Sequence, residues 1–240
     1  MEQVIVLDSS RQDIGLFTRN PTPGDEQVLV DRFIEYYTSE FKRRNKKNRL
    51  AVFIEPRIDS GFPDIVFAAF LPSILDNWSD KRERLDIIDI KLLSFLAEVN
   101  VICGTKLISK LGYPEKQTIK SLEKLLDAKL IIYRSNGWHI RKKSDIFSIT
   151  KLVAVEAKLS DIRKVVDQTF LNTRFASHSY AVLNSHNPRS GTLQTFSKHG
   201  VGLYGKGHPF KKHVEAKRYA LPSCYVSYQF NEWICKAIAH

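Results

Sequence analysis

Leu152-Val153-Ala154-Val155-Glu156-Ala157-Lys158 is the stretch on which the fold of this chain depends. The run of apolar residues from Ile149 onward predicts a strand over residues 149–157. Side chains alternate along a strand, so Glu156 and Lys158 point to one side while Val153 and Val155 point into the core. A carboxylate and an ammonium at the end of a buried strand are costly to bury unless something there uses them.

A second stretch, Gly61-Phe62-Pro63-Asp64-Ile65-Val66-Phe67, supplies the matching acid. Residues 50–55 and 65–70 read as two strands of a hairpin, and Asp59-Ser60-Gly61 signals the turn between them. Asp64 therefore begins a strand that can enter the same sheet as Glu156. Mg²⁺ takes one or two carboxylates, water and substrate phosphate, and it activates a water for attack on phosphorus. The two stretches together indicate a phosphodiester-cleaving site.

The pattern acid-x-Lys is not informative by itself, because it recurs at Glu40/Lys42, Asp89/Lys91, Asp127/Lys129 and Glu215/Lys217. Only Glu156 and Lys158 end a β-branched apolar run, and Pro63-Asp64 is the only Pro-Asp in the chain. The alternative interpretation is structural: Asp64 caps a turn, and Glu156 with Lys158 forms a surface ion pair at a strand end.

Helical periodicity surrounds these strands. Apolar residues recur at three- and four-residue spacing from Asp25 to about Arg44, with Asp25 as the expected N-cap. A second helix is expected over residues 160–174, a strand over 179–183, and a last helix over 226–239. The expected fold class is therefore α/β.

The chain of 240 residues carries a formal net charge of +11 and has a pI of about 9.5. Such an excess favours a polyanionic partner such as nucleic acid over the alternative of a merely basic protein. The basic residues gather in three separate clusters, as expected of a surface that follows a phosphate backbone. The clusters are Lys42–Arg49, Arg134–Lys143 and Lys198–Arg218.

The charge run Asp80–Arg84 is expected to be solvated and to mark a domain boundary. Between it and Lys143 the sequence forms a separate pattern of three helices and a hairpin. The helices are expected over residues 87–96, 105–111 and 114–126, and the hairpin turns at Ser135-Asn136-Gly137, where Asn-Gly tolerates positive φ. This stretch resembles a winged helix-turn-helix domain, a family that binds DNA through its third helix and its wing.

That resemblance implies DNA contacts by four residues of the third helix and two of the wing: Lys116, Gln117, Lys120, Lys124, Arg134 and Arg141. Winged helices also hold proteins, so a second copy of the chain or a partner protein is the alternative occupant of this surface.

The strand and hairpin motifs resemble those of the PD-(D/E)xK nucleases. The resemblance implies a restriction-endonuclease-like core over residues 1–80 and 145–240, with a winged helix inserted at 82–143. It implies Asp64, Glu156 and Lys158 as catalytic residues, and Mg²⁺ or Mn²⁺ held by Asp64, Glu156 and the backbone carbonyl of Ala157.

Two further acids and a glutamine complete this comparison. Glu35 matches the acid that the family carries on its first helix and would reach the metal, with Glu55 on the hairpin as the competing candidate. Gln168 matches the glutamine of the helix after the motif. The Gln-x-x-x-Tyr form of the family is not kept, because residue 172 is Asn.

The expected function is therefore a metal-dependent DNA endonuclease, aided by a DNA-binding winged helix. The alternatives are a catalytically inactive DNA-binding regulator and the nuclease subunit of a multi-protein transposase. Cys103, Cys224 and Cys235 have no metal-ligand spacing, which favours a reducing compartment. No signal peptide and no apolar run of about 20 residues is seen, so we expect a cytoplasmic protein without membrane contact.

Overall fold

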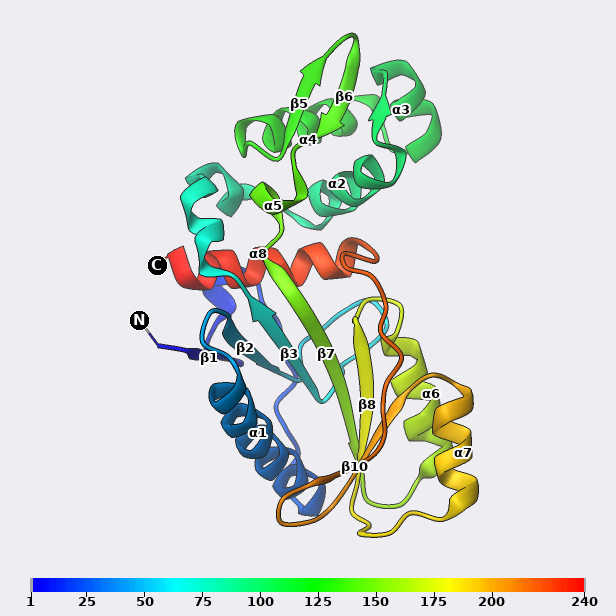
Figure 1. Ribbon diagram of the computed structural model, residues 1–240. Helices are drawn as coiled ribbons and strands as arrows, with labels where there is room; N and C mark the ends of the chain where they lie inside the picture. Colours follow the sequence, from blue (N-terminus) through cyan, green and yellow to red (C-terminus); the bar gives the residue numbers. More distant parts are fainter. Residues whose placement is uncertain (1, 240) are drawn as a thin grey trace. The chain divides into compact units, whose positions relative to one another are not determined.

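The computed structural model describes residues 2–239, which fold into two compact units (Figure 1). Unit 1 comprises the chain up to Leu71 together with Ile149–Ser223, and unit 2 comprises Pro72–Ser148 together with the segment from Cys224 onward. The expected α/β class is confirmed. The sequence-based division placed the C-terminal helix with the nuclease core, whereas in the structure this helix packs within unit 2.

Unit 1 is built on a mixed seven-stranded sheet in the order β1-β2-β3-β7-β8-β9-β10. Strand β3 pairs antiparallel with both β2 and β7, whereas β7, β8 and β9 run parallel to one another. The strands are β1 (Val4–Leu7), β2 (Arg49–Ile54), β3 (Ile65–Phe70), β7 (Ile149–Lys158), β8 (His178–Leu183), β9 (Gly202–Gly205) and β10 (Lys211–Val214).

Helices cover both faces of this sheet (Figure 1). Helix α1 (Asp25–Arg44) packs through Phe33 against one face, and the pair α6 (Ile162–Asn172) and α7 (Ser190–Lys198) packs against the other. The helix expected over 25–44 is confirmed. Asp25 is not its cap, however: the N-cap residue is Gly24, which has no side chain that could cap this end.

The carboxyl ends of the three parallel strands share one edge of the sheet. Lys158 at the end of β7 pairs with Leu183 at the end of β8, which pairs with Gly205 at the end of β9. The start of β3 lies at the same edge, because Ile65 pairs with Val155 of β7. Side chains from four segments of the sequence therefore meet where parallel strands end, which is the usual place for ligands in such sheets.

Unit 2 contains α2 (Ile87–Val99), α3 (Gly104–Leu111) and α4 (Glu115–Asp127) beside a small sheet in the order β4-β6-β5. Its strands are β4 (Val101–Ile102), β5 (Ile131–Arg134) and β6 (Gly137–Ile140). A short helix, α5 (Lys143–Ile146), and the C-terminal helix α8 (Tyr225–Ala239) complete the unit; the helix expected at 226–239 is thus confirmed. Among residues 2–239, no helix is both long and apolar enough to cross a membrane.

The β5–β6 turn differs from the expected Asn-Gly turn by one residue. Ser135 and Asn136 occupy the two loop positions, with φ of 49° and 57°, while Gly137 is already the first residue of β6 and pairs with Arg134. Gly137 is needed for another reason: a Cβ atom there would lie 2.6 Å from Cγ2 of Val101 on β4. The glycine thus allows β4 to approach the hairpin.

Four residues of the charge run Asp80–Arg84 are exposed, as expected, but Arg82 within it is completely buried. Its guanidinium donates from Nε to Glu232 Oε2 at 2.9 Å and from Nη2 to Glu232 Oε1 at 2.5 Å. It also stacks on Trp78, with 5.1 Å between the charged carbon and the ring centroid. The paired carboxylate comes from residue 232, so no local pattern in the sequence could reveal it.

This buried ion pair gives a prediction about stability. Glu232→Gln removes the charge that balances Arg82 and leaves a buried guanidinium uncompensated, so unit 2 should lose about 3–5 kcal/mol of stability. Amide hydrogen exchange of α8 and α2 measures this loss directly. Replacing both residues, as in Arg82→Met/Glu232→Met, should recover part of it. Unchanged exchange in Glu232→Gln would show that the pair does not hold unit 2 together.

Candidate active site

Asp64, Glu156 and Lys158 meet at the edge of the sheet where β7 ends and β3 begins. Asp64 Oδ2 accepts a hydrogen bond of 2.7 Å from the backbone N–H of Ala157. The ammonium of Lys158 lies 4.0 Å from the same oxygen. The antiparallel pairing of β3 with β7 holds the two acids at this point, although they lie far apart in the sequence.

Glu156 is 2% exposed and faces α6, where Oε1 accepts a hydrogen bond of 2.7 Å from Nδ2 of Asn172. Within residues 2–239 no group hydrogen-bonds its other oxygen, Oε2. Burial and the nearby charge of Asp64 raise the pKa of Glu156 to about 8. A buried carboxylate with a free oxygen is costly, and a bound cation is one of the few groups that can offset that cost.

Asp64 has a similar environment. It is 6% exposed, and burial raises its pKa despite the hydrogen bond from Ala157 and the charge of Lys158, which act in the opposite direction. Two neighbouring buried carboxylates whose pKa values are both raised are typical of sites that bind a cation or share a proton.

Glu26 is the acid of α1 that reaches this site, and sequence reasoning missed it. Its Oε1 lies 2.5 Å from Nζ of Lys158. Burial lowers the pKa of Lys158, but the hydrogen bond to Glu26 and the charge of Asp64 outweigh this effect, so the pKa is raised overall. Glu35 is exposed and lies nine residues further along α1, about 13 Å at the helical rise of 1.5 Å per residue. The structure therefore does not bring Glu35 to the site.

An open pocket of about 520 Å³ lies in front of these residues. Glu26, Glu55, Asp64, Lys158 and Gln168 all line it. Glu55, the competing candidate from the hairpin, is buried, has a φ of 44° and forms an ion pair with Arg19. The structure thus brings Glu55 to the pocket, where its carboxylate is paired with the guanidinium of Arg19.

Gln168 and Asn172 of α6 both lie beside Glu156. Gln168, which was expected to point toward the site, lines the pocket, and within residues 2–239 its buried Oε1 has no hydrogen-bond partner. Asn172 stands where the Gln-x-x-x-Tyr pattern has tyrosine and holds Glu156. The departure from that pattern at residue 172 was visible in the sequence; its contact with Glu156 was not.

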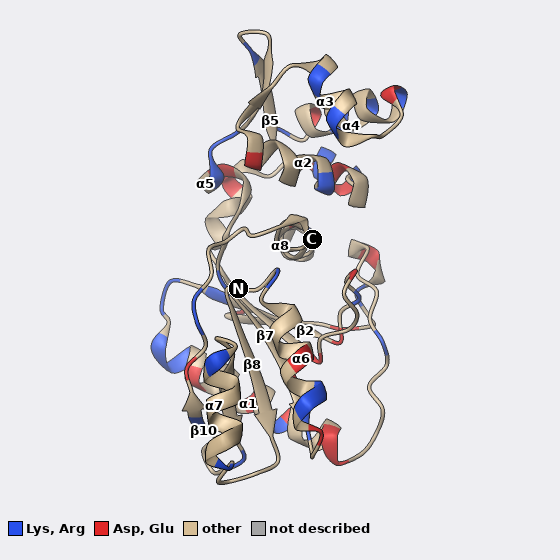
Figure 2. Ribbon diagram, turned by 90° about the vertical axis from the view of Figure 1, so that its right-hand side faces the viewer, with Lys and Arg blue, Asp and Glu red and all other residues tan. Residues whose placement is uncertain are grey.

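The residues expected to face DNA in unit 2 fall into two groups. Lys116, Gln117, Lys120 and Lys124 line one open pocket beside α4, and basic residues mark α3 and α4 in Figure 2. Lys124, however, lies 2.7 Å from Asp86 Oδ2 and 2.8 Å from Asp89 Oδ2, so its charge is balanced inside the unit. Arg134 is exposed, and Arg141 donates a long hydrogen bond of 3.5 Å to the carbonyl of Lys129.

Within residues 2–239, no cluster of three or more His, Cys, Asp or Glu side chains is arranged to hold a metal ion. The donor set at the candidate site consists of the two carboxylates of Asp64 and Glu156. The backbone carbonyl of Ala157, the third ligand implied by the resemblance, lies between Glu156 and Lys158 on β7.

Comparison with known proteins adds little to this picture. No protein-family profile and no curated protein matches the sequence. A crystal structure of protein VC1899 from Vibrio cholerae is matched at 12% identity over 84% of this chain and 86% of that chain, with a TM-score of 0.18. A similarity at that level carries no argument about fold or function.

The burial of Glu156 gives a prediction that does not depend on any activity. Glu156→Gln keeps the bond from Asn172 and removes a buried negative charge beside Asp64. It should therefore stabilise the metal-free protein by about 1–3 kcal/mol at pH 8, as measured by urea unfolding. The matched control is Glu215→Gln in the second Glu-Ala-Lys. Glu215 is paired with Lys212 and accepts a hydrogen bond from Tyr180, so its neutralisation should not stabilise. Destabilisation by Glu156→Gln would contradict this account.

Proposed function

We propose that this protein is a divalent-metal-dependent DNA endonuclease with a PD-(D/E)xK, restriction-endonuclease-like core in unit 1. The observation that carries the proposal is the buried pair Asp64 and Glu156 beside Lys158 at an open pocket. Within the described part of the chain, Oε2 of Glu156 has no hydrogen-bond partner. A purely structural ion pair would not need two carboxylates for one lysine. The net charge of +11 agrees with a polyanionic substrate.

The residues present fit a hard divalent cation. Asp64 and Glu156 offer carboxylate oxygens, and the unpartnered Oε2 of Glu156 is the group such an ion would engage. Mg²⁺ needs only one or two protein carboxylates, because water and substrate phosphate complete its shell. A bound Mg²⁺ or Mn²⁺ would supply an acidified water and charge compensation at the phosphate.

The protein's own residues have distinct roles in this proposal. Lys158 holds a positive charge beside Asp64, where it would orient a water and stabilise the negative charge that develops on the phosphate oxygens. Glu26 holds the Lys158 ammonium from α1, and Asn172 fixes the orientation of Glu156. Both are positioning residues, because each acts through a neighbouring side chain.

Unit 2 supports a second part of the proposal, a winged helix that assists DNA binding. Three helices followed by the β5–β6 hairpin match that family's order of elements. Lys116 and Lys120 border the pocket beside α4, and the exposed Arg134 lies on the hairpin. Phosphate contacts by such residues raise affinity without reading sequence.

A partner-bound nuclease subunit, as in a multi-protein transposase, is the second candidate. It is favoured by exposed apolar side chains on β4, on α4 and on the β5–β6 hairpin of unit 2. Val101 is 52% exposed, Ile119 on α4 is 44% exposed, and Tyr133 on the hairpin is 54% exposed. Apolar groups of this kind suit a protein partner better than a phosphate backbone.

The catalytic proposal is tested by cleavage of plasmid, linear and branched DNA with and without Mg²⁺. Asp64→Asn and Lys158→Met should each reduce the cleavage rate by about 100- to 1,000-fold, since each removes a group that acts on the transition state. DNA affinity, measured without metal, should stay within about threefold of the wild type. Glu215→Gln is the matched control and should cleave normally.

Metal binding is a separate readout of the same experiment. Mg²⁺ or Mn²⁺ should raise the Tm of the wild type and not that of Asp64→Asn, because only an ion bound to the folded state stabilises it. A wild type that neither cleaves nor gains stability from metal would refute the nuclease and favour an inactive DNA-binding regulator.

A salt titration distinguishes DNA binding by unit 2 from protein docking. Charge reversal of Lys116, Lys120, Arg134 and Arg141 should weaken DNA binding and flatten its dependence on salt, because each lost phosphate contact removes about 0.9 from the slope. Lys124→Glu is left out, since it would break the contacts with Asp86 and Asp89. Unchanged affinity and slope would assign this surface to a protein partner.

A further inference from the structure

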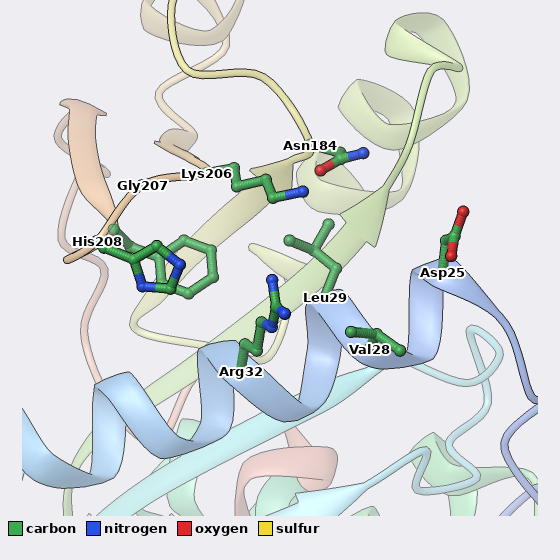
Figure 3. Close-up of a pocket in the computed structure, with 9 residues that line it drawn as sticks. Asp25, Val28, Leu29, Arg32, Asn184, Lys206, Gly207 and His208 are labelled. Carbon is green, nitrogen blue, oxygen red and sulfur yellow. The ribbon is translucent and has the colours of Figure 1, made fainter.

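A second pocket of unit 1, of about 270 Å³, lies beside the candidate active site between α1 and the loops that follow β8 and β9 (Figure 3). Three of the side chains that line it can carry a positive charge: Arg32 from α1, and Lys206 and His208 from the loop after β9. Figure 3 shows these three side chains directed into the same space. Asn184, from the loop after β8, also lines it.

The positive charge of this pocket is not neutralised by an acid of the described residues. Within residues 2–239, neither Arg32 nor Lys206 takes part in an ion pair with an acid. Asp25 is the single acid among the lining residues, and in Figure 3 its carboxylate points away from the three basic groups. Unpaired cations that converge from separate segments are a common arrangement for binding an anion.

The loop that carries Lys206 has a fixed course. The backbone N–H of Lys206 donates to the carbonyl of Leu183 at 3.0 Å, which ties it to the end of β8. The glycines on either side permit close approach: a Cβ at Gly205 would lie 2.6 Å from the carbonyl of Ser185, and one at Gly207 would lie 2.6 Å from that of Pro209. The loop therefore presents Lys206 at a defined position instead of on a free surface tail.

The base of the pocket is apolar and well packed. Leu29 and Phe210 are buried there, and the ring of Phe210 lies 5.2 Å from that of Phe33 on α1. Basic side chains beside a buried apolar lining suit a ligand with its charge at one end, such as a phosphate with its sugar behind it.

The pocket lies at the same edge of the sheet as Asp64, Glu156 and Lys158. Asn184 donates its backbone N–H to the carbonyl of Lys158 at 3.3 Å, and Lys206 follows the next parallel strand. Neighbouring strands are about 4.8 Å apart, so Lys206 begins about 10 Å from Lys158 across the sheet. This separation is on the scale of one or two nucleotides along an extended strand.

We propose that this pocket binds a backbone phosphate of a nucleic-acid strand whose cleaved phosphodiester lies at the Asp64–Glu156–Lys158 site. The proposal rests on the nuclease function and adds to it a second contact that sets the register of the substrate. Arg32 would bind the phosphate through its planar fork, Lys206 as a point charge and Asn184 through its amide.

The test compares the full-length wild type with Arg32→Gln/Lys206→Gln. Lys81→Gln/Arg174→Gln is the matched control, because it also removes one exposed lysine and one exposed arginine, and neither residue belongs to the three basic clusters. Binding of a fluorescent 16-nucleotide DNA, single-stranded and duplex, is measured by anisotropy without metal. We expect Kd to rise about tenfold in the pocket variant, with the salt slope lower by about 0.7–0.9. The control should change by less than about threefold.

Cleavage kinetics separate this inference from the nuclease proposal. With Mg²⁺, the pocket variant should raise KM about tenfold and keep kcat within about threefold of the wild type. If the wild type does not cleave, the nuclease proposal fails, and the binding comparison still decides whether the pocket holds a strand. If the pocket variant binds DNA like the control, the pocket inference is refuted, whatever the wild type cleaves.

Inorganic phosphate serves as the competing ligand. We expect inorganic phosphate to stabilise the folded wild type only weakly, because a single anion lacks the neighbouring contacts that a nucleic-acid strand makes. Stabilisation of the wild type by micromolar phosphate, absent in the pocket variant and accompanied by unchanged DNA affinity, would assign the pocket to a free anion and overturn the inference.

Discussion

The carboxylate of Glu156 lies in the interior of the protein, and among residues 2–239 only one of its oxygens is hydrogen-bonded. The arrangement of the groups around it follows from this unfavourable burial. Burial of a carboxylate next to a second one works against folding, so the surrounding structure must supply compensating stability. The strand that carries it, β7, is central in the sheet, with both faces covered by helices. A rigid central strand can hold such a group where an edge strand could not.

The same strand sets the spacing of the charged side chains at its end. Because β3 is antiparallel and β8 is parallel to β7, the start of β3 and the end of β8 lie at one edge with Lys158. The acid Asp64, the lysine and the basic pocket with Lys206 thus come from different segments, yet lie within a few strand widths. The N-terminal part of α1 contributes to both pockets, through Glu26 to one and Arg32 to the other.

Sequence reasoning succeeded where the signal was periodic and local. The apolar spacing from Val30 to Phe41 gave α1, and the β-branched run gave β7, so Asp64, Glu156 and Lys158 could be selected from several acid-x-Lys copies. It did not identify Glu26, because which acid of α1 reaches Lys158 depends on where the helix crosses the sheet. Glu35 matched a family pattern, but the turn of α1 that reaches the site lies nearer its N-terminus.

The same limit explains Arg82 and the hairpin turn. A run of five charged residues has the composition of a solvated segment, and only the distant Glu232 makes the burial of Arg82 tolerable. Gly137 has the composition of a turn residue, but it is required by the approach of Val101, so the turn lies one residue earlier. Glu232 and Val101, the residues that determine the environments of Arg82 and Gly137, are distant in the sequence, so the neighbouring residues do not indicate them.

Unit 2 is formed by two separate segments of the sequence, and contacts of the C-terminal helix α8 join the second segment to the first. Glu232 of α8 pairs with Arg82, near where the chain enters the unit. The next residue back, Asn231, accepts hydrogen bonds from the backbone and hydroxyl of Ser148 and donates to the carbonyl of Ile146, where the chain leaves it. Two neighbouring residues of one helix therefore fasten both ends of the 72–148 segment. Helix α8 thus joins two parts of unit 2 that are far from it, and from each other, in the sequence.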